Sequence, residues 1–180
     1  MNPSIHIVNL GCSRNLVDTE FLYGEFLTAG FDMAEFPEQA SVVVVNTCGF
    51  IEAAKEESVN EILARLADRK KGQKVVVAGC LSQRYMEDLR KEIPEVDLWA
   101  GTYKPDHLLQ MVKAAKWGIQ PECASGKHIP RLLTTADHYV YIKISEGCDR
   151  VCSFCAIPGI RGKHVSRSSL EIVQEVRDLH

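Results

Sequence analysis

The fold of this chain is decided by residues 41–80, which read SVVVVNTCGFIEAAKEESVNEILARLADRKKGQKVVVAGC. Two short apolar runs, Val42 to Val45 and Val75 to Ala78, flank a longer stretch, Ile51 to Asp68, in which apolar residues recur at helical spacing. Short, uninterrupted apolar runs are typical of strands that are covered on both faces. A strand, a helix and a second strand in this order indicate a crossover between parallel strands.

The same alternation extends on both sides of this stretch. We expect further strands at Ile5 to Leu10 and, more weakly, at Val96 to Ala100. Further helices are expected at Asn15 to Thr28, Ser82 to Ile93 and Asp106 to Trp117. A repeat of just over thirty residues would also fit helical repeats, but each unit here opens with a strand. The sequence therefore predicts an α/β fold, with a doubly wound parallel sheet flanked by helices.

The alternation stops after residue 117, so we predict a domain over residues 1–117. Glycine and proline interrupt residues 118–136, which we interpret as a linker. Residues 137–180 then form a second region, which is too short for a domain of ordinary size. We expect this chain to be the front part of a larger protein.

The second region opens with an expected strand, Tyr139 to Ile144, followed by a cysteine-rich loop, Gly147 to Gly162. A capping box formed by Ser168 and Glu171 predicts the start of a helix after the loop. Strand, loop and helix together read as a single βα unit.

Composition limits the class of protein. The chain has 180 residues, of which 46% are hydrophobic and 25% charged, so it can bury a core and is not disordered. It has no apolar run near the ~20 residues that span a bilayer and no secretory leader, so we expect a soluble cytoplasmic protein. Cysteines in that compartment more often bind metals or catalyse than form disulfides, and seven cannot all pair within one chain. The formal net charge of −3 argues weakly against a nucleic-acid substrate.

The sharpest motif is GCDRVCSFC at residues 147–155, which places Cys148, Cys152 and Cys155 on one short loop. Three thiolates so close together can hold one metal centre, and thiolate ligands select iron-sulfur clusters or zinc. Three ligands leave one corner of a four-iron cluster free for a substrate. The alternatives are a zinc site that borrows His164 or a distant residue as its fourth ligand, and a chance cluster of core cysteines.

A second set of cysteines becomes visible only through the predicted fold. Cys12, Cys48 and Cys80 each lie within a few residues of the end of a predicted strand. Parallel strands place their carboxyl ends at one edge of the sheet, which is where α/β proteins bind ligands. Three cysteines distant in sequence would therefore converge into a second cluster site. The alternative for each is a small buried residue in a βα turn.

Other residues carry weaker signals. Cys123 has no partner at metal-binding spacing and stays unassigned. Phe154 lies inside the triplet and either stacks on a ligand beside the cluster or packs in the loop. Basic residues make the cluster loop positively charged. This charge could steer an anionic substrate or partner, or it could simply belong to a solvent-exposed loop. The basic residues are Arg150, Arg161, Lys163, His164 and Arg167.

The triplet, together with IPGIRG at residues 157–162, resembles the cluster loop of the radical S-adenosylmethionine enzymes. That resemblance implies that Cys148, Cys152 and Cys155 hold a 4Fe-4S cluster, which binds S-adenosylmethionine, and that Phe154 lies near the adenine. The segments NLGCSRNLVDTE, VVVVNTCGFIEAAKEESVNEIL and VAGCLSQRY resemble the N-terminal domain of the methylthiotransferases. This second resemblance implies an auxiliary 4Fe-4S cluster on Cys12, Cys48 and Cys80, and it makes residues 137–180 the first βα unit of a radical-enzyme barrel.

Two branches of that family differ in their target. The segments LGCSRNLVDTE and NTCGFIEAAKEES resemble the sequences of one branch. That branch thiomethylates an aspartate β-carbon of the twelfth small-subunit ribosomal protein. The other branch acts on an adenosine of transfer RNA. The resemblance also implies an electron donor of the flavodoxin or ferredoxin type, with no membrane partner. A hypothesis of another class stays open, namely a non-catalytic iron-sulfur or zinc-binding module.

Overall fold

A computed structural model describes residues 2–102, 105–115, 117–119 and 131–179. The chain divides into two compact units, Met1–Thr134 and Thr135–His180. Cys123, His128 and most of the predicted linker lie outside the described residues. No helix among those residues is long and apolar enough to cross a membrane.

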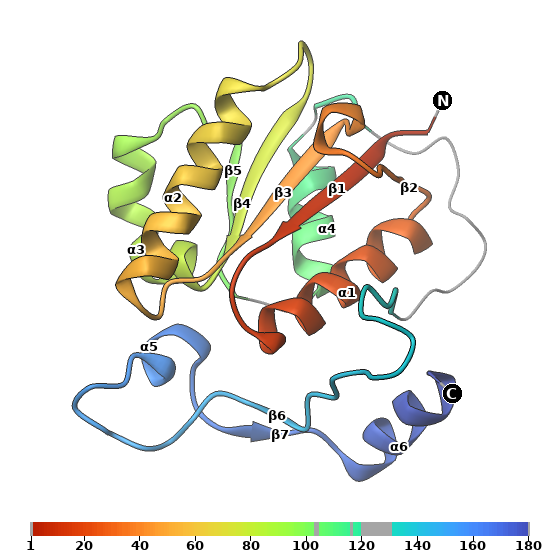
Figure 1. Cartoon of the computed structure of the whole chain (residues 1–180), viewed down its shortest axis with the longest axis vertical. Coiled ribbons are helices and arrows are strands. Elements are labelled where there is room, and N and C mark those ends of the chain that lie inside the picture. Colours follow the sequence, from red (N-terminus) through yellow and green to blue (C-terminus); the bar gives the residue numbers. More distant parts are fainter. Residues whose placement is uncertain (1, 103–104, 116, 120–130, 180) are drawn as a thin grey trace. The chain divides into compact units, whose positions relative to one another are not determined.

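The first unit is built on a parallel sheet of five strands, in the order β2-β1-β3-β4-β5 (Figure 1). All four pairings between neighbouring strands are parallel. The strands are β1 (Ser4–Asn9), β2 (Asp32–Met33), β3 (Val42–Thr47), β4 (Lys74–Gly79) and β5 (Leu98–Trp99). Every residue of the central strand β3 is buried, which explains its apolar sequence.

Helices cover both faces of this sheet (Figure 1). On one face, α1 (Ser13–Thr28) and α4 (Pro105–Ala114) bury apolar side chains against alternate residues of the strands, such as Val42 and Val44. On the other face, α2 (Glu52–Ala67) and α3 (Cys80–Glu92) pack against Val45 and Val77. A short 3₁₀ turn, Pro37–Gln39, precedes β3. The predicted doubly wound parallel sheet is confirmed.

The last described residues of the first unit are fastened to α1 by a buried ion pair. Arg131 donates to the Glu20 carboxylate from Nε at 2.9 Å and from Nη2 at 2.5 Å, and both side chains are almost fully buried. The Thr134 backbone and hydroxyl donate to the other Glu20 oxygen, at 2.7 and 3.1 Å. A buried charge pair is tolerated only when its polar atoms are satisfied in this way. Nothing in the hydrophobic pattern indicated this attachment.

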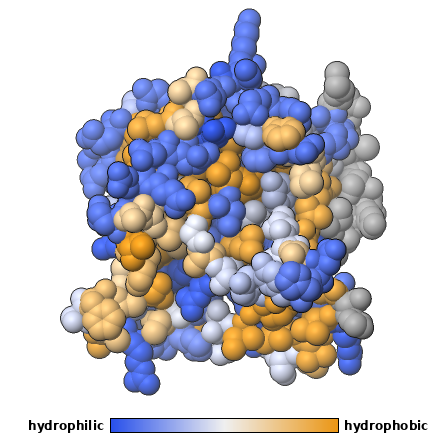
Figure 2. Space-filling model, in the orientation of Figure 1, coloured by the Kyte–Doolittle hydropathy of each residue, from blue (hydrophilic) through white to orange (hydrophobic). Residues whose placement is uncertain are grey.

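The second unit contains short elements only. It has an antiparallel pair, β6 (Ser145–Glu146) with β7 (Val165–Ser166), and two helices, α5 (Ile157–Arg161) and α6 (Ser169–Asp178). The predicted capping box is confirmed, because Ser168 Oγ accepts a hydrogen bond from the Glu171 N–H and the Glu171 carboxylate accepts one from the Ser168 N–H. Many apolar side chains of this unit are exposed, including Ile144, Val165 and Leu170, and Figure 2 shows hydrophobic residues on its visible face.

Two expectations for the second unit were wrong. Residues 139–144 do not form a strand, and only the next two residues, β6, pair with another strand among the described residues. An apolar run becomes a strand only where a neighbouring strand takes up its backbone hydrogen bonds, and the short β7 reaches no further. The cysteine-rich loop is also not irregular throughout, because its end forms α5. In the first unit, the two-residue edge strand β2 was too short to predict.

Candidate metal centres

The dispersed cysteines lie where the sheet topology brings the chain together. Cys12 is the N-cap of α1, Cys48 directly follows β3, and Cys80 directly follows β4 and begins α3. Strands β1 and β3 are neighbours, but the chain leaves β1 towards β2 and leaves β3 towards β4. Such a switch point opens a crevice at the carboxyl ends of the strands, and this is the usual ligand site of a doubly wound sheet.

Two glycines let the three cysteine-bearing turns touch. A Cβ on Gly11 would lie 2.6 Å from Cys48 Cβ and 2.9 Å from Cys48 Sγ. A Cβ on Gly49 would lie 2.7 Å from the Leu81 Cα and 3.1 Å from the Cys80 carbonyl carbon. Only a residue without a side chain fits these approaches, so Gly11 brings the first turn against the second, and Gly49 brings the second against the third.

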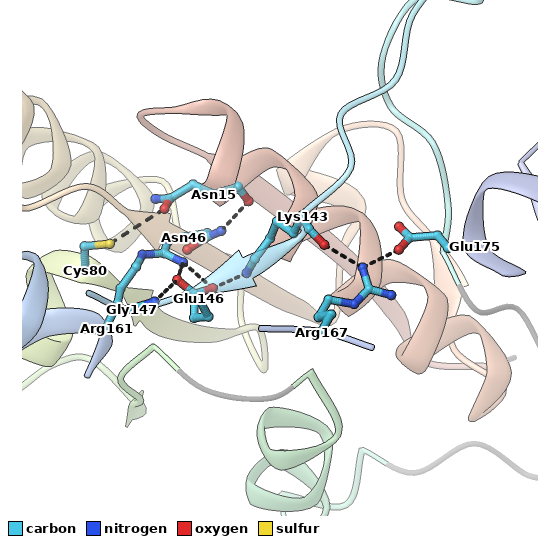
Figure 3. A network of polar contacts seen from close by, with 9 residues as sticks. All are labelled: Asn15, Asn46, Cys80, Lys143, Glu146, Gly147, Arg161, Arg167 and Glu175. Atoms are coloured by element: carbon cyan, nitrogen blue, oxygen red, sulfur yellow. Dashed lines mark hydrogen bonds and ion pairs between the residues drawn. The ribbon is translucent and has the colours of Figure 1, made fainter. Parts of the chain in front are cut away.

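Asn15 lies between the same three turns (Figure 3). Its fully buried side-chain amide donates to the carbonyl oxygens of Leu10 and Thr47, both at 2.9 Å. Its Oδ1 lies 3.7 Å from Cys80 Sγ, which donates to it. One side chain thus joins the residue before Gly11, the residue before Cys48, and Cys80 itself.

Further polar contacts hold Asn15 and Cys48 in place. The Asn46 side chain donates to the Asn15 backbone oxygen at 3.0 Å and to Thr19 Oγ1 at 3.0 Å. Ser58 Oγ accepts from the Cys48 N–H and donates to the Cys48 carbonyl, both at 3.0 Å. Cys48 and Cys80 are each 8% exposed, whereas Cys12 is exposed. The frame around these thiols belongs to the packed core of the first unit.

The contiguous cysteines lie on a loop whose two ends meet. Gly147 has φ +71°, and a Cβ there would lie 2.0 Å from the Lys163 carbonyl oxygen. The Cys148 N–H donates to the Gly162 carbonyl at 3.1 Å, and the Arg150 N–H donates to Cys148 Sγ at 3.4 Å. Cys152 is exposed, and Cys148 and Cys155 are partly so. The loop therefore presents its thiols outward from a closed base.

Glu146 fastens that base (Figure 3). Arg161 Nη1 lies 3.1 Å from each Glu146 carboxylate oxygen, the Lys143 ammonium pairs with one of them, and the Gly147 N–H donates at 3.4 Å. Burial by itself raises the pKa of Glu146, but hydrogen bonding and charge from Lys143 and then Arg161 outweigh it and hold the pKa below its ordinary value. The carboxylate thus stays ionised and joins the start of the loop to its end.

Two of the basic residues predicted to steer an anion are paired with carboxylates of this unit. Arg161 pairs with Glu146, and its side chain is 4% exposed. Arg167 donates to the Lys143 carbonyl at 2.8 Å and pairs with Glu175. Their charges are therefore structural. Phe154 is 87% exposed and the neighbouring Val151 is 97% exposed, so neither packs into the loop.

Among the described residues, no group of three or more histidine, cysteine, aspartate or glutamate side chains is gathered closely enough to hold a metal ion. The donor chemistry nevertheless fits an iron-sulfur cluster at both places. Each set offers three thiols, the ligand type that iron-sulfur clusters take.

Sequence reasoning found the cysteines but missed the residues that frame them. Asn15 carried a signal only in its position, three residues after Cys12 and in the first turn of the predicted helix. Glu146, directly before the GCDRVCSFC motif, carried none, because its partner Arg161 lies fifteen residues away along the loop.

Comparisons with known proteins cover nearly the whole chain. Residues 4–101 match the model of "Uncharacterized protein family UPF0004". Two proteins named "Ribosomal protein uS12 methylthiotransferase RimO", from Aquifex aeolicus and Bacteroides fragilis, are each 48% identical, over 175 and 180 residues. These alignments cover 97% and 98% of this chain and 38% and 40% of the relatives. A protein of the same name from Nitratiruptor is 41% identical over 179 residues, covering 99% of this chain and 41% of the relative. The chain thus spans about two fifths of the length of these relatives.

Proposed function

This chain belongs to the protein family UPF0004, its resemblance to the methylthiotransferases is confirmed, and from that premise we propose that it serves methylthio transfer to a ribosomal protein. The reaction would add a methylthio group to the β-carbon of an aspartate of uS12, the protein that the relatives' names contain. The cofactors would be two 4Fe-4S clusters and S-adenosylmethionine, with an external electron donor. A ribosomal target would place the reaction in the cytoplasm.

One observation carries this proposal furthest. The turns that bear Cys12, Cys48 and Cys80 come from distant parts of the sequence, yet Gly11 and Gly49 let them touch at the switch point of the sheet. A structural role for three separate cysteines would not need this convergence of their turns. The contact supports one shared centre.

The two cysteine sets would hold two clusters with different roles. Cys12, Cys48 and Cys80 would hold the auxiliary cluster, and Cys148, Cys152 and Cys155 would hold the cluster that binds S-adenosylmethionine. When bound, such clusters supply electrons and an open iron position for an exogenous ligand. The Asn15 amide donates to the Leu10 and Thr47 carbonyls and so supports two of the cysteine-bearing turns, and the Arg150 N–H donates to Cys148 Sγ. Hydrogen bonds to cluster sulfurs tune the reduction potential. Exposed Phe154 would stack on the adenine.

Iron content after anaerobic reconstitution tests the two sets separately. The wild-type chain should bind two clusters, and each triple variant, C12A/C48A/C80A or C148A/C152A/C155A, should lose about half of the iron because it lacks three of the thiolate ligands. Cys123→Ala is the matched control and should keep all of it. S-adenosylmethionine should change the electron paramagnetic resonance spectrum of C12A/C48A/C80A but not that of C148A/C152A/C155A. Bound zinc, or iron that is indifferent to S-adenosylmethionine, would contradict the proposal.

Activity is tested in a protein of the relatives' full length. C148A/C152A/C155A should abolish cleavage of S-adenosylmethionine, because no cluster would bind it. C12A/C48A/C80A should retain cleavage and abolish transfer of sulfur to uS12, as measured by mass spectrometry of the target protein. A thiomethylated product from the second variant would overturn the assignment of the auxiliary set. A modified adenosine in transfer RNA, with uS12 unmodified, would favour the other branch.

A further inference from the structure

A groove runs between the two helices that cover one face of the sheet, α2 and α3, which lie side by side in Figure 1. Its volume is about 490 Å³, and its lining is mainly apolar. The apolar part is formed by Val59 of α2 and by Leu81, Tyr85 and Leu89 of α3. Helix α3 is kinked within this lining, because Tyr85 has the non-helical dihedrals φ −129° and ψ 20°.

Carboxylates outnumber cations on the rim of the groove. Four acidic residues line it, and Lys55 is the one basic residue among the lining residues. The acidic residues are Glu52, Glu56, Asp88 and Glu92. Glu52 pairs with Lys55 at 2.6 Å, whereas the other three make no hydrogen bond or ion pair with any described residue. Three of the four rim carboxylates therefore have no ion pair with any described residue, and Lys55 pairs with the fourth.

The aromatic ring in the groove already attracts cations. Lys55 Nζ lies 5.5 Å from the centroid of the Tyr85 ring, and the Arg84 guanidinium lies 5.0 Å from it. The face of an aromatic ring carries negative charge and attracts ammonium and guanidinium groups, while the rest of the groove suits their aliphatic stems. The site is built for long basic side chains.

We propose that this groove binds a lysine- and arginine-rich segment of the protein substrate. The inference rests on the proposed function, since a protein that is assembled on ribosomal RNA carries basic residues to neutralise phosphates. The groove is also placed for this purpose, because Leu81 directly follows Cys80 and Glu52 opens the helix after Cys48. A substrate segment held between α2 and α3 would thus begin beside the turns that bear the auxiliary cysteines.

Binding of isolated, fluorescently labelled uS12 to the whole chain tests this proposal without any catalytic readout. The variant E56Q/D88N/E92Q removes the three unpaired charges and should weaken binding about tenfold at low salt, because each rim charge contributes modestly. The wild-type affinity should fall steeply between about 50 and about 200 mM salt, and the variant should show a shallower fall. Circular dichroism should show the same helical content for both proteins.

The matched control is E57Q/E87Q, which neutralises one exposed glutamate on each of the same two helices outside the groove. Its affinity for uS12 should stay within about twofold of the wild type, since long-range charge alone is screened. Equal weakening by both variants would overturn the inference and assign the attraction to net charge. Wild-type chain that does not bind uS12, or that uses the groove to form dimers dispersed by E56Q/D88N/E92Q, would overturn it as well.

Failure of this inference is distinguishable from failure of the proposed function. If the groove variant, in a protein of the relatives' full length, binds and thiomethylates uS12 as well as the wild type does, the groove is excluded and the function stands. If uS12 binds in the groove but is never modified under reducing conditions with S-adenosylmethionine, the groove stands and the function fails.

Discussion

The two cysteine sets of this chain are assembled by opposite means. The turns that bear Cys12, Cys48 and Cys80 are brought together by the topology of the sheet, and the groups that frame them are buried backbone carbonyls and amide side chains. Cys148, Cys152 and Cys155 lie within eight residues of one another, and an ion pair at the base of their loop holds it closed. Damage to the frame of the first set should therefore unfold the unit, whereas damage to the frame of the second should loosen one loop.

The difference also explains which thiols the two frames expose. In the first set, close approaches of backbone at Gly11 and Gly49 leave little room, and two of the three cysteines are buried. In the second set, all three cysteines are at least partly exposed. A centre that receives a large ligand such as S-adenosylmethionine needs the more open arrangement, which agrees with the roles proposed for the two sets.

Asn15→Leu should have the largest effect on this comparison. Leucine has the same branching and number of side-chain heavy atoms but leaves the buried carbonyls of Leu10 and Thr47 without their donor. Each buried unsatisfied group costs about 1–3 kcal/mol, so the loss of both bonds should lower the free energy of unfolding of the first unit by about 4 kcal/mol. Urea denaturation followed by circular dichroism measures this. The same substitution at an exposed position, Asn60→Leu on α2, serves as the control and should cost under about 0.5 kcal/mol.

Reconstitution of the Asn15→Leu variant with iron shows whether the substitution affects one cysteine set or both. Under conditions where the variant is still folded, it should retain the cluster on Cys148, Cys152 and Cys155 and bind less iron at Cys12, Cys48 and Cys80. Equal stability of Asn15→Leu and the wild type would show that the amide does not support the turns.

Gly11→Ala should have the next largest effect. The new Cβ would lie 2.6 Å from Cys48 Cβ, in a backbone conformation with φ +99° that alanine rarely adopts. Gly72→Ala provides a matched control, because Gly72 has φ +85° but nothing within 4 Å of the added Cβ. The control should lose about 1 kcal/mol of unfolding free energy from backbone strain alone, and Gly11→Ala should lose about 2 kcal/mol more from overpacking. Equal losses would show that contact with Cys48 is unimportant.

Much of this arrangement could be predicted from the sequence, for a physical reason. Buried parallel strands need apolar residues on both faces, so β1, β3 and β4 were recognised within one or two residues of their ends. Parallel strands also place their carboxyl ends at one edge of the sheet, so the sequence indicated that the turns bearing Cys12, Cys48 and Cys80 lie near one another. That the three thiols share one cluster stays a prediction. The helix after the cluster loop was found because a capping box is a local signal.

The features that could not be predicted from the sequence depend on contacts between residues distant in the chain. Residues 139–144 have the composition of a strand but no neighbouring strand to pair with in the described part of the chain, and composition alone cannot supply one. The Glu20–Arg131 ion pair joins residues more than a hundred positions apart. The acidic groove between α2 and α3 depends on how two helices pack, and separately each helix shows only ordinary surface charge.

The smallest effect is expected at the base of the second loop. Glu146→Gln keeps the shape of the side chain but removes the charge that pairs with Arg161 and Lys143. Because the side chain is partly exposed, the loss should be about 1 kcal/mol or less. Hydrogen exchange can measure it locally, since protection of the Cys148 N–H, bonded to the Gly162 carbonyl, should fall while that of the Leu10 N–H, bonded to the Asn46 carbonyl, stays unchanged. Glu175→Gln, which removes the ion pair with Arg167 in the same unit, is the control and should leave Cys148 protected.

The contribution of Glu146 to loop closure should also depend on pH, in a direction that its pKa determines. The pKa of Glu146 is held below its ordinary value of 4.5 in the folded chain, so its ionised form contributes stability above pH 4.5. That contribution is lost as the pH falls through the lower, folded pKa, where protonation breaks the pairs with Lys143 and Arg161. The wild-type loop should therefore open with acid below about pH 4.5, whereas Glu146→Gln should show no such transition at Cys148. If the loop of Glu146→Gln and that of the wild type open over the same pH range, a carboxylate other than Glu146 holds the loop closed. The ion pair at its base would then not be what distinguishes the second cysteine set from the first.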